Sequence, residues 1–216
     1  RELTVAARDG GGNVEDNPGL RTIVDKAKAA QMPKDTMERA IERGAGGQDG
    51  AQLLALTYEG YGPGGVAVLV ETMTDNRNRT VAEVRHAFTK AGSNLGTDGS
   101  VAYLFDKKGQ IQFKPGTSED DVMEIAIESG ADDVVADDEG MIEVVTEPED
   151  YLTVKDALIE GGFEPAAAEV AMVAQTYTDV DVDTGEKVLR LLDALEDIDD
   201  VTSVYTNANF PEELMT

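Results

Sequence analysis

The sequence predicts an α+β protein in which a helical N-terminal part precedes two parts that mix helices and strands. Residues 1–47 show only the apolar spacing of short helices. From residue 54 onward, β-type runs alternate with amphipathic helices, and the order strand-helix-strand-strand-helix-strand occurs nearly twice. Each sheet is expected to be mostly antiparallel with its helices on one face, which defines the α+β class.

Three short helices are expected in residues 1–47. The first ends at the glycine run 10–12. Asn17 and Pro18 have the residue types of an N-cap and of the first helical position, and apolar residues then recur at helical spacing up to Ala27. Pro33 opens the third helix, which is expected to stop at residues 44–47. Each helix has one apolar stripe, so the three predict a small bundle.

Turn and cap signals give the later elements. Thr80 with Glu83, and Asp183 with Glu186, have the spacing of capping boxes. Residues 107–109 have the composition of a hairpin turn. The expected elements are strands 54–58 and 66–73, helix 80–91, strands 101–105 and 110–114, helix 118–129, strands 133–136 and 141–146, a helix from 147–148 to 161, strand 168–174, helix 184–197 and strand 201–206.

These elements predict two α/β sandwiches of ferredoxin-like type, one inserted in the other. Strands 66–73, 101–105, 110–114 and 201–206 form the first sandwich with helices 80–91 and 184–197. The second interrupts it. The expected domains are a helical one at 1–50, a discontinuous α/β domain at 51–114 and 180–216, and an inserted acidic α/β domain at 115–179.

The charge of the chain is divided unevenly along its length. The 216 residues include 18 Lys and Arg against 44 Asp and Glu, for a net charge of −26. Residues 1–114 sum to zero, so residues 115–216 carry the whole excess. A polyanion could therefore bind only through the first half, while the acidic half repels it or faces basic proteins. The simpler alternative is that the acidic half is a well-solvated surface.

The composition argues against most enzyme classes. The chain has no cysteine, and His86 is its single histidine, which excludes thiolate and multi-histidine metal sites. No acid/base or nucleophilic set is evident. No apolar run could cross a membrane, and no signal peptide is visible. We therefore expect a cytoplasmic, non-enzymatic protein without cofactor or metal.

Two motifs resemble ligand sites but lack what those sites need. Residues 60–65 match the glycine spacing of a dinucleotide loop, yet a strand follows where that loop requires a helix. Asp179, Asp181 and Asp183 resemble the start of a calcium loop, but Thr184 and Arg190 occupy the positions that need glycine and a carboxylate.

The candidate nucleic-acid contacts are basic residues of the first half. Arg77 and Arg79 lie in the polar segment 75–79, which is expected to be a loop beside a helix N-terminus that suits phosphate. The alternative is a capping loop whose arginines pair with acids such as Asp75. The remaining candidates are spread over two expected helices: Arg21, Lys26, Lys28, Lys34, Arg39 and Arg43.

Three stretches together resemble the YebC family of gene-expression regulators. They are residues 32–35 continuing to 43–47, residues 58–65 with 75–80, and residues 96–101. The resemblance implies a helical N-terminal domain, two α/β domains and DNA-binding transcriptional regulation. The alternative that it implies is a ribosome-associated translation factor contacting ribosomal RNA. Chains of that family usually start with a basic segment, which we expect to be missing ahead of Arg1.

Overall fold

The computed structural model describes residues 1–46 and 53–215. The predicted stop at Gly47 and the predicted border at residues 50–51 lie outside this part. Contacts divide the described chain into two compact units, residues 1–105 with 174–216, and residues 106–173. The α+β class with a helical N-terminal region is confirmed.

The first unit begins with three helices, α1 (Glu2–Gly10), α2 (Pro18–Ala29) and α3 (Lys34–Ala45). The predicted cap of α2 is confirmed, because the Asn17 side chain accepts a hydrogen bond from the Leu20 N–H and Pro18 is the first helical residue. A Cβ at Gly44 would lie 2.1 Å from the Thr4 carbonyl oxygen, so this glycine lets α3 cross closely over α1. The helices bury Leu3, Ala7, Leu20, Ala27 and Met37 against one another.

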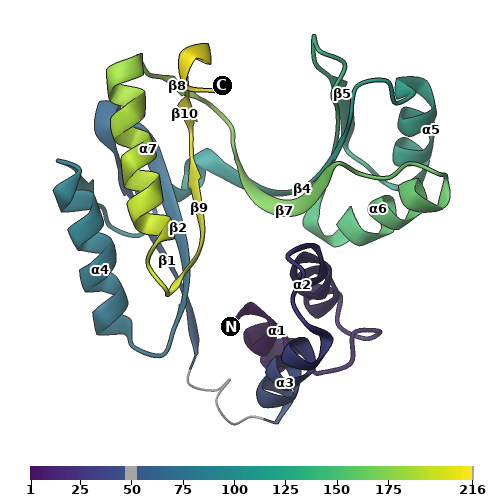
Figure 1. Cartoon of the computed structure of the whole chain (residues 1–216), viewed down its shortest axis with the longest axis horizontal. Helices are drawn as coiled ribbons and strands as arrows, with labels where there is room; N and C mark the ends of the chain where they lie inside the picture. Colours follow the sequence, from purple (N-terminus) through teal and green to yellow (C-terminus); the bar gives the residue numbers. More distant parts are fainter. Residues whose placement is uncertain (47–52, 216) are drawn as a thin grey trace. The chain divides into compact units, whose positions relative to one another are not determined.

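The first unit also contains a four-stranded antiparallel sheet whose strand order is β3-β1-β2-β9. Helices α4 and α7 cover one face of it (Figure 1). Between helices and sheet lies a core that includes Val68, Phe88 and Leu191. The elements are β1 (Leu54–Tyr61), β2 (Ala67–Thr74), α4 (Arg77–Lys90), β3 (Asn94–Leu95), α7 (Val182–Glu196), β9 (Val201–Thr206), and a small parallel pair, β8 (Thr178–Asp179) and β10 (Ala208–Asn209).

The prediction for this sheet was wrong for two of its four strands. Strands 101–105 and 110–114 were expected there, but β1 and β3 take those places. The connection at residues 62–66 returns the chain onto β1, and the hairpin is paired from Leu54 opposite Thr74 to Tyr61 opposite Ala67. Strand β1, which precedes β2 in the chain, therefore pairs with β2 at the place where the predicted repeat of elements put a later strand.

The second unit has strand order β5-β6-β4-β7, with α5 and α6 packed on one face. Its element order is strand-helix-strand-strand-helix-strand, the ferredoxin-like arrangement. The core includes Ile111, Phe113, Val144 and Leu158. The elements are β4 (Phe105–Phe113), α5 (Glu119–Ser129), β5 (Asp133–Ala136), β6 (Ile142–Thr146), α6 (Tyr151–Glu160) and β7 (Ala167–Ala174).

The hairpin turn predicted at residues 107–109 is also wrong, because β4 runs straight through it. A Cβ at Gly109 would lie 2.3 Å from the Thr146 Oγ1 and 2.8 Å from the Tyr151 ring. Glycine is thus required by close packing and not by a turn. Residues 102–104 form a 3-10 helix, and the strand that follows pairs with β6 from Gly109 opposite Thr146 onward. Residues 106–113 therefore belong to the second sheet.

Both predicted capping boxes are replaced by caps a few residues earlier. The Asn76 side chain accepts from the Arg79 N–H, so α4 starts at Arg77 and not at Thr80. Asp181, and not Asp183, caps α7 by accepting from the Thr184 N–H. Helix α6 starts at Tyr151, after a 3-10 turn over Pro148–Asp150.

Candidate nucleic-acid interface

A buried carboxylate, Asp200, organises the region around the predicted segment 75–79. Asp200 is 1% exposed and lies just before β9. The Arg79 guanidinium donates to both of its oxygens, from Nη2 at 2.9 Å and from Nε at 3.2 Å. The Thr80 hydroxyl donates to it at 2.7 Å, and Arg1 forms a further ion pair with it. Arg79 also pairs with Asp75 at 2.9 Å. Its guanidinium is therefore committed to carboxylates of its own chain.

The electrostatics of this cluster favour the ionised state of both partners. Burial opposes ionisation of Asp200, but hydrogen bonds from Arg79, Thr80 and Arg1 outweigh it and lower the pKa of Asp200 to about 2. The hydrogen bonds from Asp200 and Asp75 raise the pKa of Arg79. The cluster is a permanent ion pair at neutral pH.

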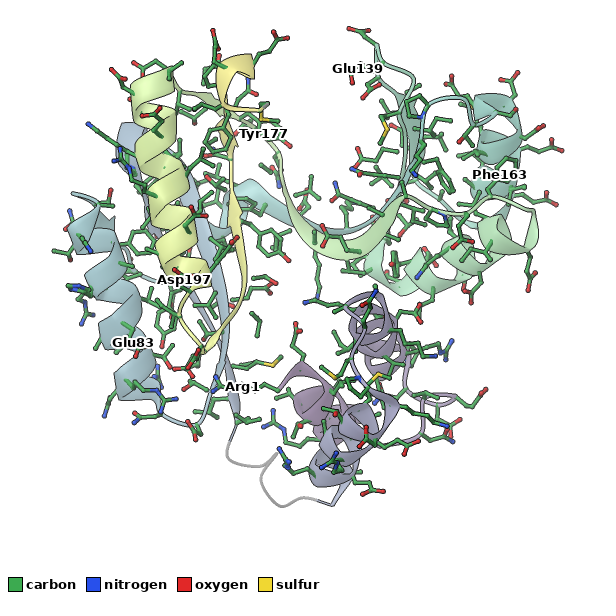
Figure 2. The ribbon with its side chains drawn as sticks, viewed as in Figure 1. Arg1, Glu83, Glu139, Phe163, Tyr177 and Asp197 are labelled. Carbon is green, nitrogen blue, oxygen red and sulfur yellow. The ribbon has the colours of Figure 1, made fainter. Side chains whose placement is uncertain are left out.

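A hollow of about 510 Å³ lies beside this cluster. Figure 2 labels three of its lining residues, Arg1 at the start of α1, Glu83 on α4 and Asp197 at the end of α7. Five of its lining side chains are acidic and only two are basic, so the hollow repels phosphate. The full lining is Arg1, Asp75, Arg79, Glu83, Ala194, Asp197, Ile198, Asp199 and Asp200.

The structure separates the two arginines that the sequence grouped as one phosphate site. Both lie in the first turn of α4 and not in a loop. Arg79 matches the alternative weighed from the sequence, an arginine paired with local acids. Arg77 is exposed and forms no ion pair with any residue that the structure describes. Only Arg77 remains available to a ligand.

The basic side chains of the helical bundle are mostly engaged as well. Arg21 donates to the carbonyl oxygens of Val14 and Glu15, and it thereby holds the loop before α2. Arg43 also has a partner within the chain. Lys28 is exposed and has no ion-pair partner among residues 1–46 and 53–215. The other candidates form exposed pairs, which are weak in water: Lys26 with Glu2, Lys34 with Glu38 and Arg39 with Asp35.

The outer side of α4 carries basic residues that were not singled out from the sequence. Arg85 and Lys90 are exposed and, in the described part of the chain, unpaired. The helix contains four Lys and Arg residues and a single acid, Glu83, in a chain of net charge −26. His86 is exposed on the same helix, beside Arg85. The net charge of each predicted helix and strand, taken one by one, shows that this helix is positive, whereas the net charge of each half of the chain does not.

The described residues contain no group of three or more His, Cys, Asp or Glu placed to hold a metal ion. Within the same residues, none of the helices has the length and apolar character needed to span a membrane.

Family models match nearly the whole chain. The model described as the TACO1/YebC protein N-terminal domain matches residues 1–47, and that of the TACO1/YebC second and third domain matches residues 53–208. The chain belongs to the TACO1/YebC family. The boundary between the two matches falls between the helical bundle and β1, in agreement with the helical and α/β parts of the structure.

Proteins similar to this chain come from several bacteria. A "Probable transcriptional regulatory protein" of Hahella chejuensis is 60% identical over 215 residues, which cover all of this chain and 86% of that protein. The "Transcriptional regulatory protein PmpR" of Pseudomonas aeruginosa is 57% identical, with 100% and 87% covered. A solved structure of a conserved hypothetical protein from Aquifex aeolicus is 46% identical with a TM-score of 0.85, and the match covers 100% of this chain and 89% of that one.

Proposed function

We propose that this protein is a nucleic-acid-binding regulator of gene expression, and that its first unit contacts duplex DNA through the outer side of α4. The observation that carries the proposal is the set of exposed cations at Arg77, Arg85 and Lys90, which form no ion pair with the residues that the structure describes. The relatives named as transcriptional regulatory proteins support the same class of function.

The electrostatic reason is the cost of bringing phosphates to an acidic protein. Cations that already pair with local carboxylates gain little by exchanging them for phosphate, as Arg79 illustrates. Cations that face only water release condensed counterions from DNA when they bind, which is favourable at low salt. Lys28 of α2 meets the same condition, and the weakly paired Lys26, Lys34 and Arg39 can add to it.

The second unit does not contribute to the proposed contact. Residues 106–173 contain 19 acidic and four basic residues. Such a surface repels a polyanion at any orientation. It leaves the first unit to bind and suits basic protein partners. No catalytic step is part of this proposal.

The test is a measurement of duplex DNA binding over a salt series, with a variant that removes two of the α4 charges. The double variant Arg85→Gln with Lys90→Gln should weaken binding and reduce the slope of log affinity against log salt by about 2, one for each lost phosphate contact. The control is Lys187→Gln with Arg190→Gln, which removes the same net charge from exposed positions of α7. Equal losses in both double variants would refute a specific role of α4.

The alternative is a ribosome-associated translation factor. It relies on the same cations, because ribosomal RNA presents the same phosphates as DNA. Co-sedimentation with ribosomes, measured at the salt concentration of the DNA titration, separates the two. Binding to ribosomes with no binding to duplex DNA would favour the translation factor.

A further inference from the structure

Two glycine-rich stretches, residues 58–65 and 96–101, meet on the first sheet, and hydrogen bonds to Glu59 join them. Glu59 is 5% exposed, and one of its carboxylate oxygens accepts from the N–H groups of Val101 and Ala102, each at 2.8 Å. The Gly96 N–H donates to the Glu59 carbonyl oxygen at 2.8 Å. A buried carboxylate thus fixes the start of the 3-10 helix η3 (Ala102–Leu104).

The close approach leaves little room for a side chain at the glycines of the two stretches. A Cβ at Gly60 would lie 2.7 Å from the Asn94 carbonyl oxygen. A Cβ at Gly96 would lie 2.6 Å from the Ser100 Oγ. Both stretches are therefore built to hold one loop rigidly against the end of β1, and neither forms a nucleotide-binding turn.

The rigid junction presents two tyrosine rings to solvent. Tyr61, the last residue of β1, is 44% exposed, and Tyr103 of η3 is 65% exposed. The Tyr61 hydroxyl donates to the Ser100 carbonyl oxygen at 3.2 Å, which orients its ring. Partial desolvation and the neighbouring Tyr103 hydroxyl raise the pKa of Tyr61, as expected for two adjacent phenols. We call Tyr61 and Tyr103 the tyrosine pair.

Tyr61 lies on the face of the sheet opposite α4 and α7, and Tyr103 belongs to η3, which packs against the same face. Side chains alternate along β1, and Tyr58 packs into the core under α4 and α7, so Tyr61 points to the opposite side. A third exposed tyrosine, Tyr177, follows Gln175, whose N–H donates to the Leu104 carbonyl oxygen at 2.8 Å beside η3. Figure 2 labels Tyr177 in the segment that leads to β8.

We propose that the tyrosine pair is a stacking site for unpaired bases of a single-stranded RNA. Two exposed and adjacent aromatic rings, one at the end of β1 and one on η3, provide a platform on which unpaired bases can stack. The bases of a duplex are already stacked and cannot use this site.

This inference rests on the proposed function and names a second kind of nucleic acid for it. In cells, single-stranded loops and bulges are mainly a property of RNA, so RNA is the expected occupant. The site is separate from the outer side of α4, which lies on the helix-covered side of the same sheet. The two contacts can therefore be tested independently on the full chain.

The experiment titrates the full chain with a fluorescein-labelled 12-nucleotide oligoadenylate at fixed salt. The variant Tyr61→Leu with Tyr103→Leu should lose about tenfold or more in affinity. The variant Tyr61→Phe with Tyr103→Phe keeps both rings and should stay within about threefold of the unmodified protein. The single variant Tyr103→Leu changes one exposed side chain and should lose part of the affinity with an unchanged melting temperature.

A second readout comes from the protein itself. The chain has no tryptophan, so its intrinsic fluorescence comes from six tyrosines, and stacking should quench it in the unmodified protein. No binding of oligoadenylate, or equal losses in the Phe and Leu double variants, would overturn the stacking site. Retained duplex DNA binding in that case would leave the proposed function standing, whereas loss of both bindings would refute both.

Discussion

The Arg79 guanidinium donates two hydrogen bonds to the Asp200 carboxylate, although the two residues are 121 positions apart in the sequence. The pair joins the first turn of α4 to the start of β9 across the whole inserted unit. Since Asp200 is fully buried and Arg79 partly exposed, the stability of the pair depends mainly on keeping the buried carboxylate satisfied.

Replacing Asp200 by asparagine should destabilise the protein by roughly 2 kcal/mol, because charged hydrogen bonds from Arg79 and Arg1 are lost. Urea unfolding at pH 7 measures the change. Asp199→Asn is the control, since Asp199 is an exposed neighbour and its loss should change stability by less than about 0.5 kcal/mol. Equal effects of the two substitutions would contradict the assigned role of Asp200.

The contribution of Asp200 should depend on pH in a defined direction. Its pKa is about 2 in the folded protein against 3.8 ordinarily, so the unfolded chain binds the proton more tightly. The stabilisation is complete above about pH 4 and is lost as pH falls toward 2. The difference in unfolding free energy between the unmodified protein and Asp200→Asn should shrink over that range. A difference that stays constant down to pH 2 would contradict the depressed pKa.

Arg77 and Arg79 should respond oppositely to alanine substitution. Arg79→Ala should lower the melting temperature, because it leaves Asp200 short of its strongest donor. Arg77→Ala should leave the melting temperature unchanged and weaken duplex DNA binding. Thermal unfolding and DNA titration of each single variant provide the test. A stability loss in Arg77→Ala would show that its exposed side chain has a structural role.

A fragment of residues 106–173 should fold alone and bind no nucleic acid. It contains the four-stranded sheet except for one end residue each of β4 and β7, two helices and its own core, and it carries 19 acids against four basic residues. Circular dichroism with a cooperative thermal transition tests folding, and DNA titration tests binding. If the fragment bound DNA as well as the full chain, the division of charge would not determine where nucleic acid binds.

Gly109→Ala should destabilise the second unit by about 1–3 kcal/mol, because the new methyl group overlaps Thr146 and Tyr151. Gly19→Ala is the matched control. It places the same methyl group in the first turn of α2 with only an ordinary contact at 3.5 Å, and should be neutral or slightly stabilising. Chemical unfolding of both variants measures the contrast. Equal stability of the two would mean that β4 relaxes without cost.

Local signals in the sequence predicted most helices and strands but not their partners. Asn17 with Pro18 fixed a helix start because both residues act within one turn. The composition around Gly109 predicts a turn, because nothing local reveals that Tyr151 and Thr146 pack against this glycine. The membership of β1 and β4 in different sheets is likewise set by long-range pairing.

The candidate site was predictable only in outline. The division of charge directed attention to the first half, and Arg77 was found there. The engagement of Arg79 could not be foreseen, because its partner Asp200 lies far along the chain in a run of similar acids. The cations of α4 are visible in the sequence, but the charge summed over residues 1–114 is zero and hides them. The tyrosine pair could not be predicted from the sequence, because Tyr61 and Tyr103 are brought together by the contact between Glu59 and the loop before η3.

The placement of β9 after the inserted unit also has a consequence for biosynthesis. At a usual rate of about 5–20 residues per second, the ribosome needs roughly 6–24 s to advance from Arg79 to Asp200. During that interval the second unit can already close its own sheet, whereas β2, rich in valine and leucine, has an open edge where β9 will pair. A nascent chain that stalls before residue 200 therefore exposes an aggregation-prone strand, and this is the stage at which a chaperone would be needed.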